Sequence, residues 1–155
     1  MSRVQLALRV SDLEGSIAFY RSLFGVEPAK LRPGYANFAI AEPPLKLVLI
    51  EGEPEQATVL DHLGVEVATT DEVAAASTRL AELGLNTLDE NDTTCCYALQ
   101  DKVWVHGPGD EPWEVYTVKA DAPHDTSLRR DADDTTACAC GTPAAGGGTP
   151  LARCC

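Results

Sequence analysis

Apolar and polar residues follow a strand period at the start of the chain and then a helix period. Every second position of 4–10 is apolar, which predicts a strand with one buried face. Ser11 and Glu14 have the spacing of a capping box, and Gly25 is typical of a helix end, so we expect a helix between them. Its apolar face is formed by Leu13, Ile17, Tyr20 and Phe24.

The same pattern recurs about sixty residues later. Apolar residues alternate over 62–67, and Thr69 with Glu72 forms a second capping-box pattern before a helix that ends near Gly84. The expected apolar face of this helix is Val73, Ala76, Leu80 and Leu83. The repetition indicates an internal duplication.

Three strand-like segments follow each helical segment. They cover 27–31, 35–41 and 45–51 in the first half, and 86–90, 97–105 and 113–118 in the second. Each half therefore reads as a βαβββ unit. We expect an α+β domain over 1–119 in which two tandem units form a curved sheet, with helices outside and a cavity inside.

The remaining segment, 120–155, has a different composition. It is rich in Asp, Thr, Ala, Gly and Pro and has no aromatic residue. Such a composition buries too little apolar surface to offset the entropy lost on ordering, so we expect a flexible tail. It contains four of the six cysteines, Cys138, Cys140, Cys154 and Cys155.

Charge and composition restrict the class of partner. The formal net charge is −12 over 155 residues, which disfavours binding to nucleic acid or to anionic membranes. No apolar run approaches the about 20 residues of a membrane-spanning helix, and the N-terminus lacks a signal-peptide pattern. We therefore expect a cytoplasmic protein that binds a small molecule or a metal ion, as a monomer or a homodimer.

Strand alternation predicts which polar side chains face the cavity. Gln5 lies on the first strand, His62 begins the equivalent strand of the second half, and Glu114 lies on the last strand. An amide, an imidazole and a carboxylate on three rigid strands form a candidate three-ligand metal site with open positions. Lys46, at the position that corresponds to Glu114, cannot be a ligand while protonated. The alternative is that all three are ordinary half-exposed polar residues.

Cys95 and Cys96 are adjacent, which is unusual in a short acidic protein. In a regular strand their side chains would point to opposite faces. Cysteines of a cytoplasmic protein remain reduced, so a pair of thiols indicates metal ligands or reactive groups before it indicates a disulfide. The alternative is that they are two small buried hydrophobic residues.

Three segments together resemble a known family. They are "RVQLALRVSDLEGSIAFYRSLFGVEPAKLRPGYANFAIAEPPLKLVL", "HLGVEV" and "TCCYALQDKVWVHGPGDEPWEVYTV". The repeat, the histidine and the glutamate strand resemble the vicinal oxygen chelate superfamily (glyoxalase, bleomycin resistance protein and dioxygenase fold). The adjacent cysteines make the chain similar to its non-haem iron C–As bond lyases, whose sequence group includes proteins labelled cadmium-induced.

This resemblance implies a function and a set of site residues. The activity would be dioxygen-dependent cleavage of the carbon–arsenic bond of trivalent methyl- or aryl-arsenicals, giving arsenite. Fe(II) would be bound by Gln5, His62 and Glu114, although the family often has histidine at the first of these positions. Cys95 and Cys96 would both bind one arsenic atom if the backbone leaves strand geometry, for which we expect a loop at 92–96. Apart from the resemblance, the paired cysteines of the Gly- and Pro-rich tail suit capture of soft metals or arsenicals, and the alternative is a disordered tail without a role.

Two other functions remain open from the sequence. One is a non-catalytic protein that binds cadmium or arsenic through its thiols and thereby confers resistance. The other is an isomerase or thiol transferase on the same scaffold, which is weakened because Lys46 occupies the fourth ligand position. Catalytic turnover of an organoarsenical distinguishes the first function from both.

Overall fold

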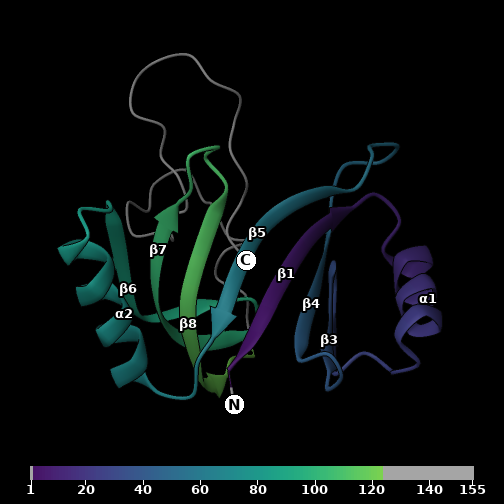
Figure 1. The fold of residues 1–155 in the computed structure, drawn as a ribbon. Helices are drawn as coiled ribbons and strands as arrows, with labels where there is room; N and C mark the ends of the chain where they lie inside the picture. The colour runs from purple at the N-terminus through teal and green to yellow at the C-terminus, as the bar shows by residue number, and fades with distance from the viewer. Residues whose placement is uncertain (1, 124–155) are drawn as a thin grey trace. The chain divides into compact units, whose positions relative to one another are not determined.

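The computed structural model describes residues 2–123, so the four tail cysteines lie outside the described residues. The order of helices and strands is βαβββ followed by βαβββ, which confirms the predicted duplication. The first repeat consists of β1 (Arg3–Val10), α1 (Leu13–Phe24), β2 (Lys30–Arg32), β3 (Tyr35–Ile40) and β4 (Leu45–Glu51) (Figure 1). The second consists of β5 (Val59–Glu66), α2 (Thr70–Glu82), β6 (Thr87–Cys95), β7 (Ala98–His106) and β8 (Pro112–Asp121).

The described chain forms two compact units that do not coincide with the repeats. The first unit comprises Met1–Val67 and His106–Glu114. The second contains Ala68–Val105 and continues from Val115. Strand β8 therefore begins in the first unit and ends in the second.

In the first unit the strand order is β2-β3-β4-β1-β5, with the start of β8 next to β5. Strand β1 is parallel to β4 and antiparallel to β5, so it lies in the middle of the sheet. Helix α1 packs on β3 and β4, as Figure 1 shows. Its predicted apolar face lies against a buried cluster that includes Phe38, Leu47 and Leu49. Val4 belongs to the apolar face of β1 that the sequence predicts to be buried, but its exposed fraction is 48%.

Helix α1 begins one residue later than the capping box predicted. Asp12, and not Ser11, is the N-cap, because its carboxylate accepts a hydrogen bond from the backbone N–H of Gly15 at 2.8 Å. A carboxylate at this position also complements the positive end of the helix dipole. Gly25 ends the helix with φ 66, the left-handed conformation that glycine adopts without steric cost.

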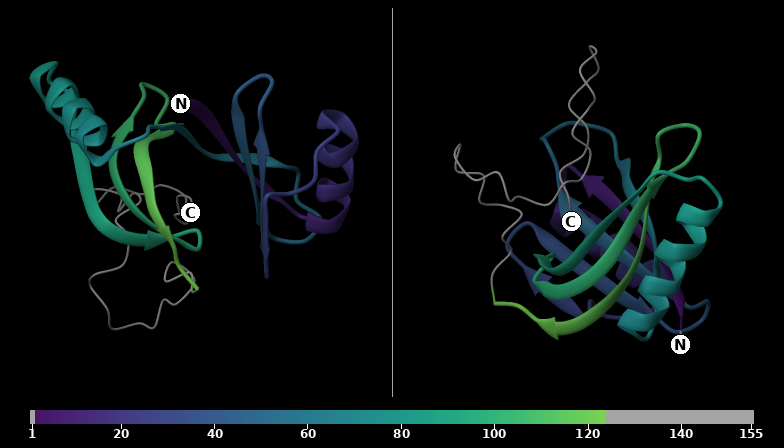
Figure 2. Two further views of the ribbon diagram at one scale, coloured as in Figure 1. Left: turned by 90° about the horizontal axis from the view of Figure 1, so that it is seen from below. Right: turned by 90° about the vertical axis from the view of Figure 1, so that its left-hand side faces the viewer.

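In the second unit the strand order is β8-β7-β6, and α2 runs beside β6 (Figure 2). The capping box of Thr69 and Glu72 is present in both directions, as predicted. Val73, Ala76 and Leu80 are buried on the expected face. Leu83 is 69% exposed because the helix ends before it and leaves it as the C-cap.

Two predicted strands differ from the observed ones. The 27–31 strand is displaced to β2, which pairs with β3 only from Lys30 to Arg32. The 86–90 strand is longer than predicted, since β6 continues to Cys95 through the segment that we expected to be a loop. An irregularity in the pairing of β6 with β7 lies between Glu90 and Thr93 and includes Asp92, whose φ is 53.

The last strand reaches Asp121, two residues beyond the predicted domain boundary at 119. Within residues 2–123, no helix has both the length and the apolar character that a membrane-spanning helix needs.

Candidate active site

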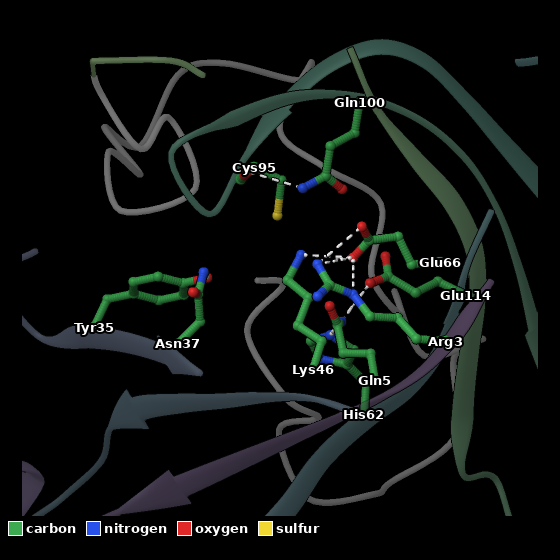
Figure 3. Close-up of polar contacts among 10 residues, drawn as sticks. All are labelled: Arg3, Gln5, Tyr35, Asn37, Lys46, His62, Glu66, Cys95, Gln100 and Glu114. Atoms are coloured by element: carbon green, nitrogen blue, oxygen red, sulfur yellow. Dashed lines mark hydrogen bonds and ion pairs between the residues drawn. The ribbon is translucent and has the colours of Figure 1, made fainter. Parts of the chain in front are cut away.

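Gln5, His62 and Glu114 come together inside the first unit. They are contributed by β1, β5 and β8, and their exposed fractions are 3%, 2% and 2%. Figure 3 shows the three side chains converging from their strands. The structure therefore brings together all three residues that the sequence proposed as metal ligands. Polar side chains are rarely buried so completely unless they form hydrogen bonds with each other or bind a ligand or metal ion.

The distances among these side chains fit a metal ion. Gln5 Nε2 lies 2.9 Å from His62 Nε2 and 2.7 Å from Glu114 Oε1. His62 Nε2 lies 3.4 Å from Glu114 Oε1. Two ligand atoms bound at right angles to an ion at about 2.1 Å are held about 3 Å apart, so small movements would admit one ion. The amide of Gln5 would turn to present its oxygen.

The donor set is unusual in one respect. No group of three His, Cys, Asp or Glu side chains within residues 2–123 is arranged to hold a metal ion. The candidate site depends on Gln5 as its third ligand. One imidazole, one carboxylate and one amide oxygen resemble the facial triad of non-haem iron oxygenases, with an amide in place of a second imidazole.

Acidic neighbours determine the protonation of His62. Its Nδ1 lies 2.7 Å from Asp61 Oδ2, and its Nε2 faces Glu114. Burial lowers the pKa of His62, but the hydrogen bonds and charges of Asp61 and Glu114 outweigh burial and raise the pKa to about 9. A protonated ring can donate to Gln5 Oε1, whereas a neutral ring can accept from Gln5 Nε2. A metal ion would have to displace the proton from Nε2.

A cationic cluster lies next to this site in the first unit. Lys46 on β4 is the register partner of Gln5, and its Nζ lies 3.4 Å from Glu66 Oε2. Arg3 also binds Glu66, with its nearest nitrogen 3.1 Å from Oε1. Figure 3 shows Lys46, Arg3 and Glu66 together. Lys46 and Arg3 thus both form ion pairs with the carboxylate of Glu66.

The two adjacent cysteines lie in the second unit at the turn between β6 and β7. Cys95 ends β6 and pairs with Ala98, while Cys96 and Tyr97 form the two-residue turn with φ 52 and 61. Positive φ at both central residues is the geometry of a type I′ hairpin turn, for which Asn-Gly is preferred. The turn places the two sulfur atoms, which form no disulfide, 3.6 Å apart. Cys96 therefore departs from strand geometry, as the predicted clamp requires, although Cys95 remains in the strand.

Two features hold this turn in place. Gln100 Nε2 donates to the carbonyl of Cys95 at 3.2 Å, and Gln100 is itself 3% exposed. Its Oε1 is buried without a hydrogen-bond partner among the described residues. Tyr97 O accepts from Ala122 N at 2.8 Å, which ties the turn to the end of β8.

A buried carboxylate organises the irregular part of β6 before the cysteines. Asp101 is 1% exposed and accepts from Thr70 Oγ1 at 2.6 Å and from the backbone N–H of Asp92 at 2.8 Å. Lys119 Nζ binds both Asp92 and Asp101. Burial raises the pKa of Asp101, but the hydrogen bonds from Thr70, Asp92 and Lys119 outweigh it and lower the pKa. The network fixes Asp92 in its left-handed conformation.

Sequence reasoning missed Asp61, Gln100 and Asp101 as supporting residues. Asp61 directly precedes His62, but strict alternation would place its side chain on the opposite face. Gln100 and Asp101 lie in a run of three polar residues, 100–102, which would ordinarily indicate a solvent-exposed stretch, although the structure buries all three. An acid directly before a candidate metal-binding histidine is the one signal that could have been noticed.

The fold and the residues of this site define the class of the protein. Residues 3–115 match the model of the glyoxalase/bleomycin resistance protein/dioxygenase superfamily, and the chain belongs to this superfamily. The likeness extends to solved structures. A homoprotocatechuate 2,3-dioxygenase variant from Brevibacterium fuscum is 23% identical with TM-score 0.57, and the match covers 76% of this chain and 32% of that chain. The methylmalonyl-CoA epimerase of Mycobacterium tuberculosis is 17% identical with TM-score 0.56, over 74% and 85% of the two chains. These similarities establish the fold.

Proteins with higher sequence identity relate the chain to one group within the superfamily. The chain is 64% identical to a trivalent organoarsenical cleaving enzyme of Thermomonospora curvata, over the full length of both chains. It is also 64% identical to the cadmium-induced protein CadI of Mycobacterium tuberculosis, over 79% of this chain and 80% of that protein. A trivalent organoarsenical cleaving enzyme of a Bacillus strain is 38% identical over 100% of this chain and 99% of its own. These relatives confirm the resemblance that the sequence motifs indicated.

Proposed function

We propose that this protein cleaves the carbon–arsenic bond of trivalent organoarsenicals, using Fe(II) and dioxygen and releasing arsenite. The observation that carries the proposal is the coexistence of two unusual arrangements in one short chain. One is the buried set of Gln5, His62 and Glu114, and the other is the pair of sulfurs 3.6 Å apart at Cys95 and Cys96. The high identity to an organoarsenical cleaving enzyme supports the assignment.

The proposed role of the cysteines follows from the chemistry of trivalent arsenic. A methyl- or aryl-arsenic(III) is a soft centre with two exchangeable positions, so it binds best to two thiolates at once. Thiols that point to opposite faces of a strand cannot both reach one atom. The turn at Cys96 removes this obstacle, and the sulfurs already lie close enough to bind one arsenic. Cys95 and Cys96 would thus hold the arsenic and leave its carbon substituent unbound.

The proposed role of the buried set is to hold Fe(II). Gln5 Oε1, His62 Nε2 and Glu114 Oε1 would be its ligands, and positions would remain open. When bound, the iron supplies redox activation of dioxygen, which oxidises the carbon that leaves arsenic. In this ligand set Glu114 would contribute a negative charge and Gln5 a neutral oxygen.

A second candidate function is retention of soft metals without catalysis. It is favoured by the two adjacent cysteines, which form no disulfide, and by the relatives that are named as cadmium-induced proteins. Such a protein would bind arsenic or cadmium at Cys95 and Cys96 with no need for the buried set. Catalytic release of arsenite therefore separates the two functions.

Substitution of one ligand tests the proposal. The chain loaded anaerobically with Fe(II) should bind one iron and convert a trivalent organoarsenical to arsenite in air. His62→Ala should lose both stoichiometric iron and arsenite release. His106→Ala is the matched control, because His106 ends β7 and is exposed, and it should retain both. Unchanged iron binding in His62→Ala would overturn the ligand assignment.

A further inference from the structure

Strand β5 contains a bulge at Asp61, directly before the histidine of the candidate metal site. Ala7 of β1 pairs with His62, and the next residue, Leu8, pairs with Leu60. Asp61 is therefore the extra residue, without a partner across the ladder. In a regular strand neighbouring side chains point to opposite faces, whereas a bulge can redirect one of them.

The bulge brings the carboxylate of Asp61 to the ring of its neighbour. Asp61 Oδ2 lies 2.7 Å from His62 Nδ1, a distance typical of a charge-assisted hydrogen bond. The side chain of Asp61 is 1% exposed, so this bond is shielded from water. With Nδ1 occupied in this way, the other ring nitrogen, Nε2, is directed at Gln5 and Glu114.

Arg9 compensates the buried charge of Asp61. Its Nε lies 2.5 Å from Asp61 Oδ1, and its side chain is 20% exposed. Oδ1 accepts no hydrogen bond from the described residues, so Arg9 acts on it through charge. A buried carboxylate without a cationic partner destabilises the fold. Arg9 is this partner, and the ion pair joins Asp61 on β5 to β1.

From this arrangement we propose that Asp61, held by Arg9, is a positioning residue that fixes the tautomer and orientation of His62 for metal binding. The inference rests on the proposed iron site and adds a residue to it. A carboxylate that accepts from the distal nitrogen of a ligating histidine keeps the proton on that nitrogen and increases the basicity of the ligating one. Here the donor atom so prepared is His62 Nε2.

A purely structural role for Asp61 would give a different outcome. As part of an ion pair with Arg9, Asp61 could simply join β5 to β1, and its loss would then affect folding and leave the affinity of the folded protein for iron unchanged. A positioning role predicts that metal affinity falls even where the fold is intact. The test therefore has to measure Fe(II) binding directly and not activity alone.

The first measurement compares the Fe(II) dissociation constants of the full chain and its variants by anaerobic titration. Asp61→Asn retains the size of the side chain but loses its charge, and Asp61→Ala removes the acceptor as well. Both are expected to weaken Fe(II) binding by about 10- to 100-fold, the usual effect of removing such a partner. Glu66→Gln is the matched control, since it removes one negative charge from an acid that pairs with Arg3 and Lys46, and it should lose much less affinity.

The second measurement starts from the wild-type chain, so its first result does not depend on whether a variant folds. In the Fe(II)-loaded wild-type chain, the Nδ1 proton of His62 should give a paramagnetically shifted proton resonance in water that disappears in deuterated water. In Asp61→Ala this proton should exchange rapidly with solvent and its signal should broaden away. A wild-type spectrum without such a resonance overturns the proposal, as does a folded Asp61→Ala variant that binds Fe(II) as tightly as wild type. Failure of the wild-type chain to bind Fe(II) would instead overturn the iron site itself, and the positioning role with it.

Discussion

Replacing Cys96 with serine removes one of the two thiols that we expect to bind arsenic. The side chain of Cys96 is half-buried at a turn residue with φ 52, and its sulfur lies 3.6 Å from that of Cys95. Serine has nearly the same shape and the same backbone preferences, so the turn should persist. A hydroxyl does not bond to trivalent arsenic as a thiolate does, so one ligand is lost while the fold is retained.

The expected loss follows from the geometry of the pair. Once the first sulfur has bound, the second As–S bond forms within the same molecule, and such intramolecular second contacts typically raise affinity by about 10²- to 10⁴-fold. The left-handed conformation costs about 1–2 kcal/mol per residue, and here it is already present in the folded protein before any ligand arrives. Because little rearrangement is then needed on binding, we expect a loss toward the upper end of this range, about 4–5 kcal/mol.

The assay is calorimetric titration of phenylarsenic(III) into a chain whose tail cysteines, Cys138, Cys140, Cys154 and Cys155, are all serine. In this background only the pair at the turn can bind. Cys95→Ser should show the same loss as Cys96→Ser, because either variant leaves a single thiol. Both variants should bind Fe(II) as the parent does. Equal arsenical affinity of the parent and Cys96→Ser would refute the two-thiol clamp.

Three further predictions concern stability, protonation and the tail. Thr69→Ala breaks the capping box with Glu72 and should lower the free energy of unfolding by about 1 kcal/mol in urea denaturation, while an unchanged midpoint would contradict the role of the cap. In the metal-free protein the pKa of His62 is raised from 6.5 to about 9. The stabilisation from protonated His62 should therefore be complete below pH 6.5 and disappear as the pH rises through 9. Thermal unfolding of wild type and His62→Ala across this pH range should show the difference in stability shrinking as the pH rises. Truncation after Asp121 should raise KM for the arsenical and leave kcat nearly unchanged, and a loss of kcat in the folded domain would show that the tail takes part in the chemistry.

The repeated fold could be predicted because its signals are local. Strand alternation, helix periodicity and capping residues appear twice in the same order, and each is fixed by neighbours a few positions away. Where competing local signals exist, the prediction fails by a residue or two, as at Asp12, which caps α1 in place of Ser11. Leu83 fits the helical period but follows the last helical residue, so periodicity alone misplaced it.

The candidate site was predictable only in part. Alternation along the strands predicts that Gln5, His62 and Glu114 face the interior, and all three are buried. The features that orient the side chains of the site are interruptions of regular strand geometry, and a periodic pattern of apolar residues cannot reveal them. The bulge at Asp61 and the left-handed turn at Cys96 both reverse the direction that alternation would assign.

The oxygen requirement of arsenite release tests the central claim most directly. The full chain is loaded anaerobically with one equivalent of Fe(II) and mixed with a trivalent organoarsenical, and the arsenic species are separated and measured before and after oxygen is admitted. The proposed function predicts unchanged organoarsenical without oxygen, then arsenite together with an oxidised carbon fragment once oxygen is present. Organoarsenical that remains bound and intact after oxygen is admitted would contradict the enzyme and leave a protein that only retains arsenic.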